Sequence, residues 1–139
     1  MKGVLVDTGP LVALLNGRDA FHPWARAILS EVEPPLRTCE AVLSEACFLL
    51  RRVSRGPDAV LQLVSRGVVE IPFRLDAELA AVRKLMARYA NVPMSLADAC
   101  LVRMTELDAG ATVLTLDADF RVYRRNGRQA VQAILPETR

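Results

Sequence analysis

Five carboxylates of this 139-residue chain stand where an isolated acid is costly or where an apolar run ends. Asp7 closes a short apolar run near the N-terminus, and Asp117 and Asp119 follow another run near the C-terminus. Glu45 and Asp98 are each the only charge in an apolar stretch of helical character. A lone carboxylate on an apolar helix face costs several kcal/mol of desolvation unless a partner compensates it. These acids are therefore the first candidates for chemistry.

If the acids converge in one pocket, their repulsion raises their pKa values and destabilises the fold, and a hard divalent cation relieves that repulsion. Ligand sets made only of oxygen select Mg²⁺ or Mn²⁺ rather than Zn²⁺. The single histidine, His22, is expected in a solvated turn, and the sequence has no Cys-x-x-Cys pair, so a zinc site is disfavoured. The glycine-rich motifs of nucleotide-binding loops are missing from the sequence as well. The acids accordingly predict a site for Mg²⁺ or Mn²⁺.

Each acid also has an ordinary structural explanation. Asp7 could cap the helix that is expected after it, as aspartate commonly does. Glu45 could pair with Arg52 further along its own helix. Ser95 and Asp98 could form a capping box, in which an acid is stabilised at a helix N-terminus without any ligand. The two acids that follow the late apolar run could cap the next helical turn in the same way.

A magnesium ion held by carboxylates chiefly serves phosphate chemistry, because it polarises a phosphoryl oxygen and neutralises charge in the in-line transition state. The last 20 residues carry five arginines and one acid. Four of these arginines, Arg121, Arg124, Arg125 and Arg128, are candidates to contact a nucleic-acid backbone or an acidic inhibitor. Tyr123 between them could stack on a base or pack in the core, and the core is favoured.

The elements that must position these residues follow from apolar periodicity and from Gly and Pro breaks. Strands are predicted at residues 4–6, 68–72, 111–116 and 130–135. Helices are predicted at residues 11–16, 23–32, 40–53, 58–65, 76–89 and 95–107. Short strands that alternate with helices favour an α/β domain with a parallel sheet covered on both faces, here as one domain over residues 1–139. Ligands bind such sheets beyond the carboxyl ends of the strands, where the acids are expected.

Composition narrows the class of protein. Hydrophobic residues make up 52% and charged residues 24%, the formal net charge is +2, and the mean hydropathy is +0.22, which excludes a disordered or fibrous chain. Neither a membrane-spanning run nor a secretory signal is recognisable, so a cytoplasmic protein is expected. Cys39, Cys47 and Cys100 are odd in number and flanked by apolar residues, which is typical of reduced core thiols.

Four acidic segments occur in a recognisable order across nearly the whole chain. They are Val4–Leu11, Ser44–Ala46, Leu96–Ala99 and Thr115–Phe120. In order and spacing they resemble the four motifs of the PIN-domain ribonucleases, and above all those of the VapC-type toxins of bacterial toxin–antitoxin pairs. This resemblance implies a three-layer α/β/α fold, a Mg²⁺- or Mn²⁺-dependent endoribonuclease, an antitoxin partner and a homodimer. It also implies supporting hydroxyls near the site, those of Thr8 and Thr115.

Carried over by motif, the resemblance implies that Asp7, Glu45 and Asp98 are catalytic metal ligands. Both acids of the fourth segment are candidates for the remaining ligand. Asp117 is favoured over Asp119 because it directly follows the predicted strand.

The main hypothesis is therefore a metal-dependent endoribonuclease that leaves 5′-phosphate and 3′-hydroxyl ends, the toxin of a type II toxin–antitoxin pair. The alternative is a catalytically weak PIN-fold module that binds RNA or protein, which the intact acids disfavour. A phosphatase of the haloacid-dehalogenase type would need Asp-x-Asp after the first strand, and Asp7-Thr8-Gly9 lacks the second acid.

Overall fold

Seven strands and six α-helices lie within residues 1–137, the part of the chain that the computed structural model describes. The strands are β1 Val4–Val6, β2 Leu36–Arg37, β3 Val69–Glu70, β4 Thr112–Leu114, β5 Arg124–Arg125, β6 Gln129–Ala130 and β7 Ala133–Ile134. The helices are α1 Thr8–Leu15, α2 His22–Leu29, α3 Glu40–Leu49, α4 Gly56–Ser65, α5 Leu79–Arg88 and α6 Leu96–Leu107, with a 3₁₀ helix, η1, at Ala118–Arg121.

Five of the strands form one parallel sheet in the order β3-β2-β1-β4-β7. The central strand β1 is apolar throughout, and its three residues are at most 1% exposed. Leu5 is level with Val113 of β4 on one side and with Arg37 of β2 on the other. A strand buried on both faces has this continuous apolar composition because helices cover both sides of the sheet.

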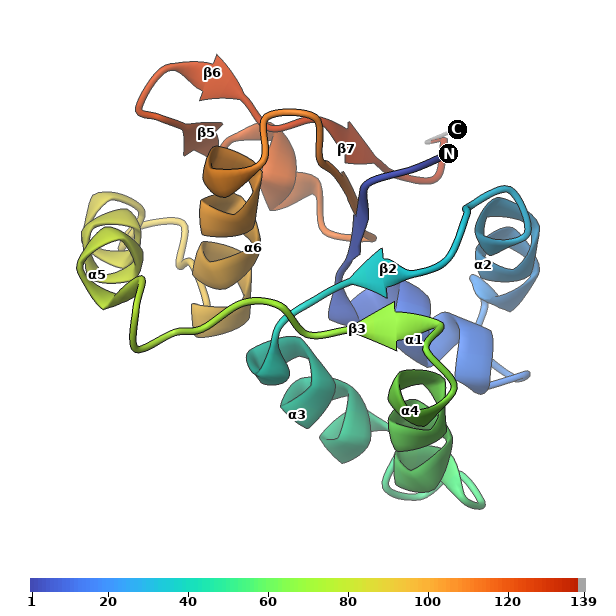
Figure 1. The fold of residues 1–139 in the computed structure, drawn as a ribbon. Coiled ribbons are helices and arrows are strands. Elements are labelled where there is room, and N and C mark those ends of the chain that lie inside the picture. The colour runs from blue at the N-terminus through green and yellow to red at the C-terminus, as the bar shows by residue number, and fades with distance from the viewer. Residues whose placement is uncertain (138–139) are drawn as a thin grey trace.

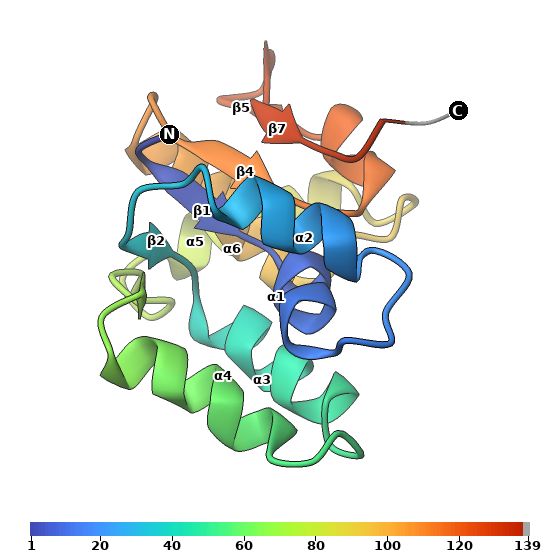
Figure 2. The same cartoon turned by 90° about the vertical axis from the view of Figure 1, so that its right-hand side faces the viewer.

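The helices lie on both sides of the sheet, as the two ribbon views show together (Figures 1 and 2). In Figure 2, α1 and α2 lie in front of the sheet, and α5 and α6 lie behind it. Helices α3 and α4 occupy the lower end of the molecule in both views. The sheet with its two helical layers confirms the predicted three-layer α/β/α fold class.

One strand of the sheet is missing from the sequence prediction. With two residues, β2 is too short to show an alternating pattern, and its strand conformation is fixed by its neighbours. Leu36 N donates to Val68 O at 2.8 Å, and Thr38 N donates to Glu70 O at 3.1 Å. Inter-strand hydrogen bonds of this kind are set by the tertiary fold rather than by local preference.

The predicted strand at 130–135 is divided between two sheets. Ala130 pairs with Arg124 in an antiparallel β5–β6 hairpin, whereas β7 joins the main sheet beside β4. The hairpin turns at Asn126 and Gly127, which both have positive φ, 51° and 78°. Asn-Gly is a strong local signal for such a turn because both residues tolerate the left-handed region. The sequence therefore carries a hairpin signal that the strand prediction overlooks.

Several helix bounds differ from the predicted ones, and the interpretation of His22 is wrong. This residue opens α2 and is half-buried, with its ring Nδ1 2.7 Å from Ala13 O. Ala13 lies in the last turn of α1, where carbonyl groups have no partner within the helix. His22 therefore donates a hydrogen bond that closes the end of α1, a contact between two helices that sequence spacing does not reveal.

Two of the three cysteines lie in the core, as predicted, and the third packs against its margin. Cys39 and Cys100 are buried and Cys47 is half-buried, all three without a disulfide. The largest fully buried side chains are Tyr123 and Phe120, which come after strand β4 in the sequence. Over residues 1–137, no helix is both long enough and apolar enough to cross a membrane.

Candidate active site

A hollow of about 370 Å³ opens at the carboxyl ends of β1 and β4. Four carboxylates from four separate segments of the chain line it, those of Asp7, Glu45, Asp98 and Asp117. They come from the end of β1, from α3, from the first turn of α6 and from the segment after β4. The topology thus brings together residues that are more than 100 positions apart in sequence, as parallel sheets do at this edge.

Asp7 is held on both of its oxygens. Oδ1 accepts from the backbone N of Thr8 at 2.8 Å, which makes Asp7 the N-cap of α1. Oδ2 accepts from the hydroxyl of Thr115 at 2.7 Å. The cap that explains this acid structurally is therefore present, and the same side chain is also part of the hollow. The two explanations coexist because Asp7 stands between strand and helix.

Glu45 differs from the sequence interpretation in its surroundings. It is exposed rather than buried on an apolar face, and Phe48 and Leu49 beside it on α3 are 60% and 49% exposed. The desolvation cost expected for this acid is therefore absent. Within residues 1–137 it makes no ion pair with Arg52. Its side chain instead accepts a hydrogen bond at Oε2 from the hydroxyl of Thr8, at 3.2 Å.

Asp98 is 8% exposed and belongs to a capping box at the start of α6. Its backbone N donates to Ser95 Oγ at 3.0 Å, and its Oδ2 accepts from Ser95 N at 3.3 Å. The phenol of Tyr123 donates to the same Oδ2 at 2.9 Å. The capping explanation is therefore correct for Asp98, and it leaves this carboxylate facing the hollow as well.

Tyr123 is the contact to the site that sequence reasoning did not identify. It is fully buried, as the core interpretation held, and its ring meets Phe120 and Tyr89 edge-on with centroids 5.2 and 5.1 Å apart. The hydroxyl of Tyr89 accepts from the backbone N of Arg124 at 2.8 Å. A phenol in this setting needs a polar partner, and Asp98 provides it.

The two acids of the fourth segment lie differently. Asp117 lines the hollow, whereas Asp119 is absent from its lining. Asp117 caps the 3₁₀ helix η1 by accepting from Asp119 N at 2.9 Å, and its own backbone N donates to the Thr115 hydroxyl at 2.9 Å. Thr115 thus links the backbone of Asp117 to the carboxylate of Asp7. This placement favours Asp117 over Asp119, in line with the sequence prediction.

The electrostatics of the hollow are set first by burial. Burial raises the pKa of Asp7 to about 6, against the hydrogen bonds from Thr115 and Thr8, and the charges of Asp98 and Glu45 raise it further. Burial also raises the pKa of Asp98, which the hydrogen bond from Tyr123 opposes. Within residues 1–137 no lysine or arginine forms an ion pair with a carboxylate of the hollow. The predicted repulsion is therefore present, although desolvation is the larger effect.

The donor set is composed of carboxylate and hydroxyl oxygens, which fits a hard divalent cation such as Mg²⁺ or Mn²⁺. In the described part of the chain, however, no three acidic, histidine or cysteine side chains are grouped so that they could hold a metal ion as they stand. The acids share one hollow without forming a closed coordination sphere. Mg²⁺ usually keeps several water ligands and binds through one or two carboxylates, so a cation does not need a closed set of protein ligands here.

The predicted contact arginines fall into two groups. Arg121 and Arg128 are exposed. Arg124 and Arg125 are half-buried, and Nη1 of Arg124 donates to the carbonyls of Arg121 and Tyr123 at 2.8 and 3.0 Å. Nε of Arg125 is buried and has no hydrogen-bond partner among residues 1–137. Arg124 is therefore engaged in closing η1, and the exposed pair is better placed to meet a ligand.

Comparison with known proteins places this chain in a family. The family model of the PIN domain matches residues 4–126. The structure of Mycobacterium tuberculosis VapC20, described as a toxin that cleaves the sarcin–ricin loop, is similar to this chain with a TM-score of 0.75 and 26% sequence identity. The match covers 86% of this chain and 93% of that one. A search of curated protein sequences found no match. The chain therefore belongs to the PIN-domain family, and its resemblance to the VapC-type toxins is confirmed.

Proposed function

We propose that this protein is an endoribonuclease that depends on Mg²⁺ or Mn²⁺ and acts as the toxin of a type II toxin–antitoxin pair. The observation that carries the proposal is the single hollow lined by Asp7, Glu45, Asp98 and Asp117, with no cationic side chain paired to them in residues 1–137. The similarity to VapC20, a toxin described as cleaving the sarcin–ricin loop, supports RNA as the substrate.

Each residue of the hollow has a distinct part in the proposal. The four carboxylates would hold the ion, and the ion would polarise the phosphodiester and neutralise charge in the in-line transition state. The hydroxyl of Thr115 fixes one oxygen of Asp7, and the hydroxyl of Thr8 reaches Glu45. The reaction adds water across the P–O bond, so that the phosphate stays on the 5′ end and the 3′ oxygen leaves as a hydroxyl.

The test is cleavage of RNA with Mg²⁺ or Mn²⁺, with and without a chelator, by wild type and by Asp98→Asn. Asparagine keeps the size of the side chain and can still cap α6, so a loss of activity reports the charge. Asp58→Asn is a matched control, because Asp58 is exposed on α4 and its side chain, within residues 1–137, hydrogen-bonds only to Gln62. Equal activity of Asp98→Asn and wild type would reject the assignment.

A catalytically weak module that binds RNA or protein is the second candidate. It is favoured by one observation, namely that the acids do not form a closed metal-binding group in the described residues. Metal-independent binding of RNA without cleavage products, unchanged in Asp98→Asn, would support this candidate over the nuclease.

The proposal includes an antitoxin and a homodimer. Phe48 and Leu49 on α3 and Leu96 on α6 are large apolar side chains exposed to solvent, which is unusual unless a partner covers them. Light scattering of wild type and of Phe48→Ser measures whether a second copy covers this surface. For the antitoxin, the informative observation is a small open reading frame next to this one, whose product suppresses cleavage when added.

A further inference from the structure

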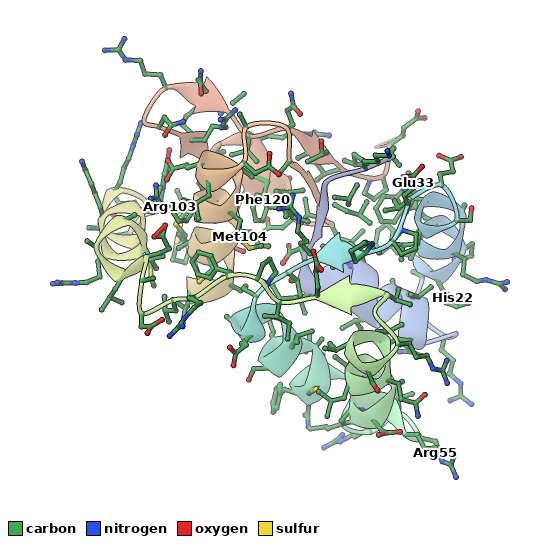
Figure 3. All side chains as sticks on the ribbon, in the orientation of Figure 1. His22, Glu33, Arg55, Arg103, Met104 and Phe120 are labelled. Atoms are coloured by element: carbon green, nitrogen blue, oxygen red, sulfur yellow. The ribbon has the colours of Figure 1, made fainter. Side chains whose placement is uncertain are left out.

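We propose that a second hollow, between α5, α6 and the β5–β6 hairpin, binds the phosphate backbone of the RNA away from the bond that is cleaved. The inference rests on the proposed ribonuclease function and deepens it, since it predicts a substrate that extends beyond the catalytic site. The hollow has a volume of about 500 Å³, larger than the catalytic one, and Lys84, Arg88 and Arg103 are among its lining residues. Figure 1 shows the hairpin above α5 and α6, and Figure 3 shows Arg103 between these helices.

One arginine is shared by the two acids around this hollow. Arg103 pairs with Glu78 at 3.1 Å and with Glu106 at 3.3 Å. The other oxygen of Glu106 accepts a hydrogen bond from the backbone N of Asn126. Lys84 and Arg88, in contrast, make no ion pair with any acid of residues 1–137. The three cations and two acids together carry a net charge of +1, and the unpaired Lys84 and Arg88 favour an anion.

Arg88 is held in place without using up its donors. Its Nη2 donates to Gly127 O at 2.9 Å, and its guanidinium lies 5.2 Å from the ring centroid of Tyr89. A Cβ at Gly127 would come within 3.4 Å of Nη1 of Arg88, and this glycine has a φ of +78°. That distance is an ordinary van der Waals contact, so the turn requires glycine because of its φ and not because of the guanidinium. A guanidinium has five N–H donors, so the remaining ones suit the oxygens of a phosphate.

The hollow lies against the same helix and the same aromatic cluster as the catalytic site. Tyr89, beneath the guanidinium of Arg88, packs edge-on against Tyr123, whose hydroxyl bonds to Asp98. Along α6, Glu106 follows Asp98 by eight residues, about 12 Å at the rise of an α-helix. A polyanion that enters the catalytic hollow can therefore reach the second one only if it continues past the reacting bond. RNA fits this requirement, whereas a mononucleotide does not.

The experiment measures binding of a labelled RNA stem–loop and of a labelled trinucleotide in the presence of a chelator, so that no cleavage occurs. The test variant is Lys84→Gln with Arg88→Gln. We expect the Kd for the stem–loop to rise about tenfold, and the slope of log Kd against log salt to become shallower by about 1.4 to 1.8, as for two lost phosphate contacts. The Kd for the trinucleotide stays unchanged. Arg18→Gln with Arg66→Gln removes two exposed charges elsewhere and leaves both values as in wild type.

Equal stem–loop binding by the test variant and the control variant would overturn the inference. So would a test variant that loses a dimer in light scattering, because the hollow would then lie between two copies of the chain. If Arg88→Gln unfolds the hairpin, the single variant Lys84→Gln tests the inference instead. We then expect about half of the change in the salt slope. Because binding is measured without cleavage, these outcomes do not depend on whether Asp98→Asn abolishes activity.

Discussion

The hydroxyl of Tyr123 donates to Oδ2 of Asp98 at 2.9 Å from a position with no exposure to solvent. Oδ2 also accepts from the backbone N of Ser95, whereas Oδ1 of Asp98 takes part in no hydrogen bond within residues 1–137. One oxygen of the carboxylate is thus fixed by the protein and the other is left for a ligand. The buried aromatic cluster of Tyr123, Phe120 and Tyr89 holds the donor in place.

Tyr123→Phe tests this positioning role, because phenylalanine keeps the ring and removes only the donor. We expect a loss of about 2 kcal/mol in the free energy of unfolding, the usual contribution of a hydrogen bond to a charged group. We also expect weaker binding of Mn²⁺ and a kcat/KM about tenfold lower, since Asp98 is no longer held in one orientation. Calorimetric titration with Mn²⁺ measures the loss of metal affinity without reference to activity.

Tyr89→Phe is the matched control. It removes a hydroxyl from the same aromatic cluster. This hydroxyl accepts a hydrogen bond from the backbone N of Arg124 and contacts no acid of the hollow. Equal losses of metal affinity in both variants would show that the cluster acts through stability alone and would contradict the positioning role.

The raised pKa of Asp7 gives a pH dependence with a defined sign. Its pKa rises from 3.8 to about 6 on folding, so the folded protein binds more protons than the unfolded protein between these values. In the metal-free protein, this residue therefore lowers the free energy of unfolding as pH rises from about 4 to 6, by at most about 3 kcal/mol. Above pH 6 the loss of unfolding free energy caused by Asp7 stays constant.

Asp7→Asn removes the titration and should make metal-free protein more stable than wild type at pH 7.5, with the difference vanishing near pH 4. Urea unfolding with a chelator, at several pH values across this window, gives the two curves. Asp58→Asn, at an exposed position, should follow wild type throughout. A difference between Asp7→Asn and wild type that does not vary with pH would contradict the assignment of the shift to Asp7.

The parts of the site that sequence could predict are those tied to strand ends and helix starts. Asp7 follows an apolar run, and Asp98 sits where a helix begins, so both could be placed at the sheet edge from local pattern. Glu45 shows the limit of the same reasoning. An apolar stripe on a helix has the same pattern whether it faces the core or an uncovered surface, and here Phe48 and Leu49 are exposed.

The parts that sequence could not predict depend on contacts between distant segments. The bond from Tyr123 to Asp98 joins residues 25 positions apart. The strand β2 exists because two neighbouring strands provide its hydrogen-bond partners. His22 closes the end of α1 only because α1 and α2 pack together. None of these relations has a spacing that a helix or strand period would reveal.

Addition of a divalent cation should stabilise the protein through the carboxylates of the hollow. Because a ligand that binds only the folded state raises its stability by RT ln(1 + [L]/Kd), we expect a Tm that increases with Mg²⁺ or Mn²⁺ concentration. The increase should be lost in Asp98→Asn and kept in Asp58→Asn. Differential scanning fluorimetry with and without the cation measures this. An equal increase in all three proteins would indicate binding elsewhere on the surface.

Gly56 permits the close approach of the first turn of α4 to the end of α3. A Cβ at this position would lie 2.9 Å from Cβ of Leu50 and would also collide with the Leu50 carbonyl oxygen. Leu50 is fully buried, so it cannot move away without disturbing the core.

We expect Gly56→Ala to lower the free energy of unfolding by about 1 to 3 kcal/mol, as overpacking of a core does. Gly17→Ala, where a Cβ would meet nothing within 4 Å, is the control and should leave stability within about 0.5 kcal/mol of wild type. Equal urea midpoints for the two variants would contradict this account of why the chain has glycine at position 56.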